Sequence, residues 1–170
     1  MGEKKNAVKV MVFGTFDGLH FGHLNFFEQA RGLSPRKSFL IVSIARDKNV
    51  FRIKKRLPTL NEKERMALVR KCSLADKVVL SGIKNYLPHI IKEHPDIIAL
   101  GYDQRAYVQN LKKDFKNKGL AVKIIRLKPY KKNIFKNRLL YVAQAKRQKS
   151  SRQKNRGENH KKIFKGGDKH

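Results

Sequence analysis

The sequence has few of the features on which several classes of protein depend. Cys72 is the only cysteine in 170 residues, which excludes disulfide frameworks and zinc sites built from thiolates. No apolar run approaches the length of a membrane span, and the first residues lack the apolar segment of a signal peptide. We therefore expect a cytoplasmic protein with no membrane association, in which Cys72 is a small buried residue.

Acidic residues are also scarce, since 13 Asp and Glu face 41 Lys and Arg, a formal net charge of +28. Residues 145–170 carry ten of these cations against Glu158 and Asp168, and the preceding residues still hold a net +20. Such a field favours polyanions such as nucleoside triphosphates, and less specifically nucleic acid. Because the last residues have almost nothing to bury, we expect a folded domain over 1–145 and a disordered basic tail over 146–170.

One stretch near the N-terminus has the composition of a phosphate-binding turn. An apolar run over residues 8–13 predicts a strand, and an amphipathic helix is predicted shortly after it. Three glycines and two histidines lie between or at the helix start. They are Gly14, Gly18, His20, Gly22 and His23.

The position of this turn gives it its chemistry. A helix N-terminus presents unpaired N–H groups and about half a positive charge, which suits phosphate. His20 and His23 are three residues apart, so both lie on one face of the first helical turn. An ordinary strand-to-helix loop without a ligand is the alternative, but the whole string is harder to obtain by chance than either part.

The rest of the chain alternates between strand-like and helix-like segments. Apolar runs predict further strands at residues 38–45, 76–80, 96–100 and 120–127. Helices with periodic apolar residues are predicted between them, and the length is sufficient for a sheet covered by helices on both faces. The first helix has its apolar stripe at Phe21, Leu24, Phe27 and Ala30.

Local signals refine two of these helices. Asn61 followed by Glu64 predicts a capping box at a helix start. Another helix is predicted to begin near Pro88 and to stop before residue 95. Its two histidines, His89 and His94, have no spacing that indicates a metal site, so we expect both at the surface.

Charged clusters follow two of the strands, at the sheet edge where α/β proteins bind ligands. Arg46, Asp47 and Lys48 follow the second strand, and a solvated strand end is an equally good interpretation. A basic loop is expected at residues 50–58, in which a cation can neutralise phosphate charge. Asp103, after the fourth strand, suits either a helix cap or contact with a ribose, a base or a metal-bound water.

The string from Gly14 to His23 resembles the His-x-Gly-His signature of the cytidylyltransferase-like nucleotidyltransferases. This resemblance implies a Rossmann-like three-layer α/β sandwich with a five-stranded, mostly parallel sheet. It implies transfer of a nucleoside monophosphate from a nucleoside triphosphate to a phosphate-bearing acceptor, with Mg²⁺ or another divalent cation and release of pyrophosphate.

Further strings are similar to the archaeal-type FAD synthases, which adenylate FMN with ATP. They are residues 45–48, Arg65 and residues 95–104, which end in Gly-Tyr-Asp-Gln. The glycerol-3-phosphate cytidylyltransferases, which use CTP, share the histidine box but usually have a different acidic pair after the later glycine. The adenylyltransferase is favoured, and the cytidylyltransferase remains the alternative.

The resemblance implies roles for particular residues. His20 and His23 are the expected catalytic residues. Nucleotide binding is expected at Gly14, Thr15, Phe16, Gly22, Asp103 and Arg138. Candidates for the acceptor site or the phosphate loop are Asp17, Arg46, Asp47, Lys54, Lys55, Arg65, Tyr102 and Gln104. No set of metal-ligating side chains is predicted.

One departure from the family pattern concerns the segment before the last predicted helix. Asn137 and Arg138 stand where many members carry hydroxyl residues that touch the distal phosphates. Both side chains can donate hydrogen bonds to phosphate. A catalytically weakened nucleotide-binding or nucleic-acid-binding protein is therefore the alternative of another class. By analogy alone, since related enzymes are often dimers, a homodimer is expected.

Removal of residues 146–170 should leave nucleotide turnover nearly unchanged and weaken binding to nucleic acid, because the tail is rich in charge and its one apolar pair, Ile163 and Phe164, is too little for a core. Pyrophosphate release and the fluorescence anisotropy of a labelled oligonucleotide measure the two properties. Loss of turnover in the shortened chain would show that the tail is part of the enzyme.

Overall fold

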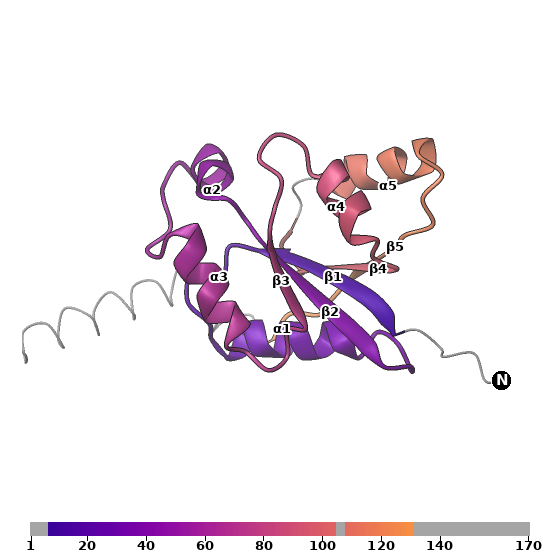
Figure 1. Cartoon of the computed structure of the whole chain (residues 1–170), viewed down its shortest axis with the longest axis horizontal. Coiled ribbons are helices and arrows are strands. Elements are labelled where there is room, and N and C mark those ends of the chain that lie inside the picture. The colour runs from indigo at the N-terminus through magenta and orange to yellow at the C-terminus, as the bar shows by residue number, and fades with distance from the viewer. Residues whose placement is uncertain (1–6, 105–107, 131–170) are drawn as a thin grey trace, which may run out of the picture. The chain divides into compact units, whose positions relative to one another are not determined.

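The computed structural model describes residues 7–104 and 108–130 (Figure 1). Its elements are β1 (Val8–Gly14), α1 (Phe21–Arg31), β2 (Ser38–Ile44), α2 (Asp47–Lys54), α3 (Glu62–Arg70), β3 (Lys77–Leu80), α4 (Leu87–Glu93), β4 (Ile97–Leu100), α5 (Val108–Asn117) and β5 (Lys123–Arg126). Contacts group Met1–Tyr130 into one compact unit. The expected boundary at residue 145, the tail and Arg138 lie outside the described residues.

The strands form one sheet in the order β3-β2-β1-β4-β5, and all four pairings are parallel. The expectation of a mostly parallel sheet is thus confirmed. The central strands β1, β2 and β4 consist largely of buried apolar residues, as strands covered on both faces require. The chain order reverses between β1 and β4, which is the position where open α/β sheets bind ligands.

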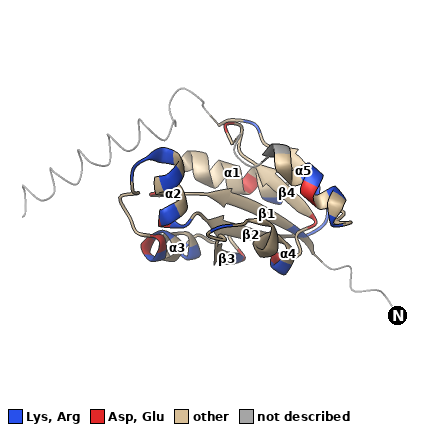
Figure 2. Ribbon diagram, turned by 90° about the horizontal axis from the view of Figure 1, so that it is seen from above, with Lys and Arg blue, Asp and Glu red and all other residues tan. Residues whose placement is uncertain are grey.

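Helices cover both faces of the sheet and so complete the predicted three-layer sandwich (Figures 1 and 2). One apolar core lies between the sheet and the pair α1 and α3, and a second lies between the sheet and the pair α4 and α5. The first includes Val10, Val12, Phe27 and Val69, and the second includes Met11, Ile90, Leu111 and Phe115. Successive residues of β1 alternate between these cores, as the pleat of a strand dictates.

Helix α2 replaces the first half of the basic loop that the sequence predicts over 50–58. Asp47 supplies a carboxylate in its first turn, where the helix dipole favours negative charge. Val50 is its buried residue, and Lys55 ends it in the left-handed conformation with φ +55°. A helix of eight residues is marginal by itself, so the tertiary contacts described below account for it.

Three side chains test the expectations about burial. Phe21 is 71% exposed, so the prediction that it belongs to the apolar stripe of α1 is wrong. This residue lies in the first turn of the helix, beyond the edge of the core. His89 is also not a surface residue, because it is half-buried and its Nε2 lies 2.9 Å from the Ser43 hydroxyl. Burial lowers the pKa of His89. His94 is exposed, as predicted.

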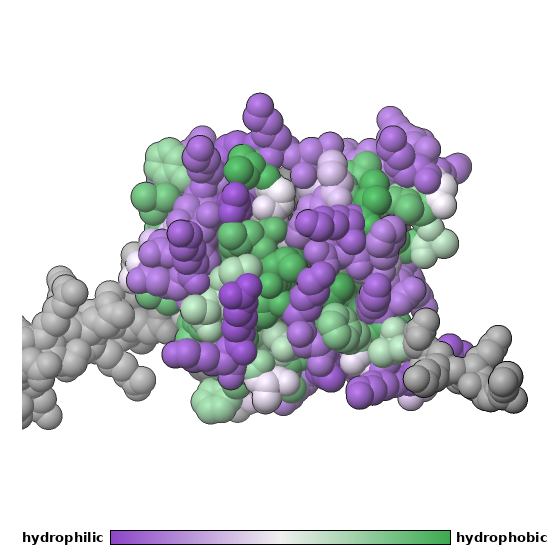
Figure 3. Space-filling model, viewed as in Figure 1, coloured by the Kyte–Doolittle hydropathy of each residue, from purple (hydrophilic) through white to green (hydrophobic). Residues whose placement is uncertain are grey.

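The visible surface is mainly hydrophilic, with scattered apolar side chains (Figure 3). Lys and Arg greatly outnumber acidic residues along the ribbon, notably on α2 (Figure 2). Among the described residues, no helix has the length and apolar character needed to cross a membrane.

Gly14→Ala should destabilise the fold by roughly 1–3 kcal/mol, the usual cost of overpacking a core. A Cβ at Gly14 would lie 2.5 Å from the buried ring of Phe16, which has no room to move. Gly32→Ala is the matched control, because its Cβ meets nothing closer than 3.5 Å and its φ is −75°. Urea unfolding measures both, and equal stability of the two variants would contradict this account.

Candidate active site

Both histidines of the glycine-rich turn lie at the start of α1. His20 is the N-cap residue, and its Nδ1 accepts a hydrogen bond from the His23 backbone N–H at 3.3 Å. The imidazole rings stack with their centroids 3.7 Å apart and their planes inclined by 25°. The two rings share one face of the helix, as their spacing predicts. Since Nδ1 of His20 is an acceptor, the proton of this ring is assigned to Nε2.

The His23 ring is neutral at pH 7. Desolvation lowers its pKa to about 3, with repulsion from His20 and Lys54 in the same direction and a hydrogen bond to the Gly18 backbone opposing them. Its Nδ1 is buried and has no hydrogen-bond partner among residues 7–104 and 108–130. A neutral imidazole has one N–H donor and one acceptor, so the ring has hydrogen-bonding capacity that the described part of the protein leaves unused.

Phe16 supports this arrangement from within the core. Its ring is 3% exposed and contacts the rings of His23 and Phe27, with both centroid distances at 5.2 Å. Its φ of +49° is uncommon for a residue with a side chain. Because the ring points into the core beside Gly14, only the backbone of Phe16 is available to a ligand.

The guanidinium of Arg65 lies beneath the turn, completely buried. It donates to the carbonyls of Thr15 at 2.5 Å and Ala45 at 2.8 Å, and to the Asp47 carboxylate at 2.6 Å. Its Nε donates to the Leu60 carbonyl at 3.1 Å. Arg65 is a sequence-based candidate for substrate contact, but its burial excludes such contact in this structure. It joins the ends of β1 and β2 to helices α2 and α3 instead.

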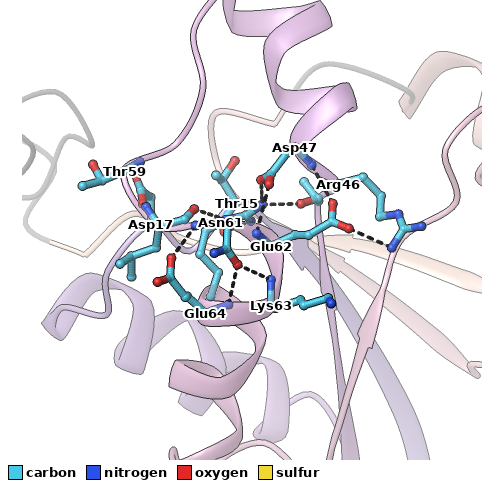
Figure 4. Close-up of polar contacts among 12 residues, drawn as sticks. Thr15, Asp17, Arg46, Asp47, Thr59, Asn61, Glu62, Lys63 and Glu64 are labelled. Carbon is cyan, nitrogen blue, oxygen red and sulfur yellow. Dashed lines mark hydrogen bonds and ion pairs between the residues drawn. The ribbon is translucent and has the colours of Figure 1, made fainter.

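Helices α2 and α3 also cap each other's first turns (Figure 4). The Asp47 N–H donates to Glu62 at 2.9 Å, and the Glu62 N–H donates to Asp47 at 3.1 Å. Arg46 pairs with the same Glu62 carboxylate at 3.0 Å. The predicted capping box of Asn61 and Glu64 is present beside them. Arg46 and Asp47 of the charged cluster after β2 therefore bind protein groups. Sequence reasoning missed Glu62, whose only signal is its place directly after the N-cap.

Asp17 has a similar structural use. Its two carboxylate oxygens accept hydrogen bonds from the N–H groups of Thr59 and Leu60, at 2.8 and 2.9 Å (Figure 4). This places the loop between α2 and α3 against the glycine-rich turn. The sequence makes Asp17 a candidate for the acceptor site or the phosphate loop. In the structure its carboxylate instead holds the loop between α2 and α3 in place.

Lys54 is the cation of α2 that reaches the turn. Its Nζ donates to the Thr15 hydroxyl at 3.2 Å. Although much of the side chain is exposed, partial desolvation and the neighbouring Arg56 lower the pKa of Lys54, while Asp17 and Asp103 oppose this. Lys54 therefore lies among groups from three separate loops. Lys55, the C-cap residue of α2, is exposed.

The loop after β4, residues 101–104, adjoins the same turn. The Gln104 amide donates to the Phe13 carbonyl at 2.6 Å and accepts from the Gly101 N–H at 3.0 Å. It thus spans β4 and β1 at the point where the strand order reverses. Asp103 is exposed, and burial together with Asp103 raises the pKa of Tyr102. Arg126, which sequence reasoning missed, bonds this loop from β5.

Residues 11–154 match the model of the cytidylyltransferase-like family. The chain belongs to this family. The FAD synthase of Korarchaeum cryptofilum is 42% identical over 119 residues, which are 70% of this chain and 80% of that protein. The FAD synthase of Methanothermus fervidus is 38% identical over 123 residues, 72% of this chain and 84% of that protein. The resemblance to archaeal-type FAD synthases is thereby confirmed.

Two solved structures have a similar fold. The lipopolysaccharide core biosynthesis protein of Thermoplasma volcanium is 32% identical, with a TM-score of 0.67 over 74% of this chain and 99% of that one. Pantoate–β-alanine ligase from Francisella tularensis has a TM-score of 0.50 over 72% of this chain and 59% of its own, and at 16% identity it supports the fold alone.

The stability of the unliganded protein should fall as the pH is lowered from 7 to 5, in part because of His23. Its pKa is about 3 in the folded protein and 6.5 in the absence of the fold, so the unfolded chain binds the extra proton in this range. His23→Gln should flatten the dependence, measured as the urea midpoint at each pH. An equally steep dependence in the variant would show that His23 is charged in the folded protein.

Proposed function

We propose that this protein is an FAD synthase, an adenylyltransferase that joins the AMP moiety of ATP to FMN and releases pyrophosphate. The observation that carries the proposal is the stacked pair of His20 and His23 at the N-terminus of α1, beside a glycine turn at the switch point of the sheet. Such a helix terminus binds phosphate. The named relatives, at 38–42% identity, support ATP and FMN as the substrates.

The reaction is an in-line displacement at the α-phosphorus of ATP. A phosphate oxygen of FMN forms the new P–O bond, and the bond from the α-phosphorus to the oxygen that bridges to the β-phosphate breaks. Pyrophosphate leaves with that electron pair. No covalent intermediate with the protein is required, so positioning and electrostatics supply the catalysis.

We assign the catalytic role to His20 and His23. The Nε2–H of His20 donates to the phosphates as negative charge develops, and the stacked His23 ring holds the His20 ring in place. Lys54, held at Thr15, contributes positive charge beside them. Nucleotide binding is assigned to residues of the turn, to the loop after β4 and to one residue outside the described part of the chain. These residues are Gly14, Thr15, the backbone of Phe16, Gly22, Asp103 and Arg138.

The remaining candidates are assigned to positioning, because their side chains are committed to other protein groups. Arg65, Asp47 and Arg46 fix the ends of β2 and α2. Asp17 fixes the loop before α3, and Gln104 fixes the loop after β4. Tyr102 and Lys55 stay candidates for contact with the acceptor.

A divalent cation, Mg²⁺ in the first instance, is proposed to bind with ATP. Mg²⁺ is usually held by one or two carboxylates together with substrate phosphates, not by a cage made only of protein. No cluster of three or more metal-ligating side chains occurs among the described residues, and the exposed Asp103 carboxylate suits the shared type of site. The cation would neutralise phosphate charge.

Three further proposals concern nucleic acid, the cell compartment and the oligomeric state. The surplus of Lys and Arg in residues 146–170 supports non-specific nucleic-acid binding. The free thiol of Cys72 suits a reducing, cytoplasmic compartment. A homodimer is proposed by analogy with related enzymes.

Pyrophosphate release is measured for four substrate pairs, in which ATP or CTP is combined with FMN or glycerol 3-phosphate. Release should occur only when ATP, FMN and Mg²⁺ are all present. His20→Ala should reduce the rate by about 10²–10³, the loss expected from one donor to a developing oxyanion. His94→Asn, at an exposed histidine, is the control and should keep full activity.

Other outcomes of this assay decide between the alternatives. Release with CTP and glycerol 3-phosphate would keep the fold and the mechanism but change both substrates. Nucleotide binding without release for any pair would make the protein a nucleotide-binding member of the family whose chemistry has been lost.

A further inference from the structure

Arg126, the last residue of β5, makes an unusual set of contacts for an exposed arginine. Its Nη1 lies 2.7 Å from the carbonyl oxygen of Gly101, 3.0 Å from that of Gln104 and 3.3 Å from that of Tyr102. All three acceptors belong to the loop after β4, and hydrogen bonds from a charged donor are stronger than neutral ones. One guanidinium on the edge strand therefore gathers the carbonyl groups of a four-residue loop.

A second anchor holds the same loop from the opposite direction. The Gln104 side chain bonds both to Gly101 within the loop and to Phe13 at the end of β1. The loop is therefore fixed to β1 on one side and to β5 on the other. Within the described part of the chain, neither the side chain nor the carbonyl of Asp103 bonds to Arg126 or to the Gln104 side chain.

The contacts with Arg126 also set the direction of the loop's donors. In a trans peptide the C=O and the following N–H point in opposite directions, and no cis peptide occurs among the described residues. Since the Gly101 and Tyr102 carbonyls face Arg126, the N–H groups of Tyr102 and Asp103 face away from it. The Asp103 carboxylate acts electrostatically on Lys54, which contacts Thr15 of the glycine-rich turn.

We propose that Arg126 is a positioning residue for nucleotide binding, which holds the 101–104 loop so that Asp103 and the adjacent N–H groups face the nucleotide. Arg126 does not touch the substrate itself. The inference rests on the proposed function, because the nucleotide is taken to bind between this loop and the glycine-rich turn.

Arg126→Ala should raise the KM for ATP and the Kd for ATP, measured by calorimetry without FMN, by roughly tenfold to a hundredfold, as expected when one charged hydrogen-bonding group is removed. The KM for FMN and kcat at saturating ATP should stay within about twofold of the unaltered protein. Arg126→Met, which keeps an unbranched apolar stem but has no donor, should behave in the same way and decides the matter if the alanine variant does not fold.

Lys123→Ala is the matched control. It lies on the same strand, is also exposed and removes the same charge, but it pairs with Ile97 at the far end of β5. It should leave the affinity for ATP unchanged, which separates the loss of specific hydrogen bonds from a weaker general attraction of anions. Thermal melting should show all three variants folded at the assay temperature.

Unchanged ATP affinity in both Arg126 variants would overturn the inference, as would an equal loss in Lys123→Ala. A uniform loss in kcat and in both KM values would also overturn it, since that pattern indicates general damage to the fold. The calorimetric result separates this inference from the proposed function. Weaker ATP binding in the Arg126 variants supports the positioning role even if the unaltered protein makes no FAD, and absence of ATP binding in the unaltered protein would overturn both.

Discussion

The arrangement of the candidate site depends on one buried cation. The guanidinium of Arg65 has no exposed surface, and leaving such a group without partners inside a protein would cost several kcal/mol. Carbonyl groups from two strand ends and one loop, with the Asp47 carboxylate, supply its partners. Because these groups satisfy Arg65 only when their segments are correctly placed, the same bonds that stabilise the cation also fix the relative positions of the glycine-rich turn, α2 and α3.

Much of this could be predicted from the sequence, where the signal is local. The apolar runs predicted the five strands, and Asn61 with Glu64 predicted the start of a helix. The spacing of His20 and His23 predicted that their rings share one face of α1. Helix α2 could not be predicted, because its stability comes from contacts with Glu62 and Arg65 that are distant in the sequence. For the same reason, residue type alone could not separate charged groups that bind the protein from those that face a ligand.

The structure separates the charged groups that bind the protein from the groups that are open to a ligand. Most of the charged side chains near the turn are paired with one another or with backbone groups, as Arg46, Asp47 and Asp17 are. The groups left at the turn include a neutral imidazole and a helix N-terminus. In so basic a chain, a neutral imidazole at the turn does not increase the general attraction for anions, as a further fixed charge would. Lys54 is the exception, and desolvation followed by repulsion from Arg56 lowers its pKa.

At the N-cap position of His20, the residue best for helix stability differs from the residue that the proposed activity requires. One atom of this side chain, Nδ1, serves the helix by accepting a hydrogen bond from the N–H of His23, and the proposed chemistry uses the Nε2–H of the same ring. Asp, Ser and Asn are better N-cap residues than histidine. Selection for heat resistance alone would therefore tend to replace His20, and its retention would signal selection for turnover. In a library of variants sorted only by folding, this position should be among the first to lose its native residue.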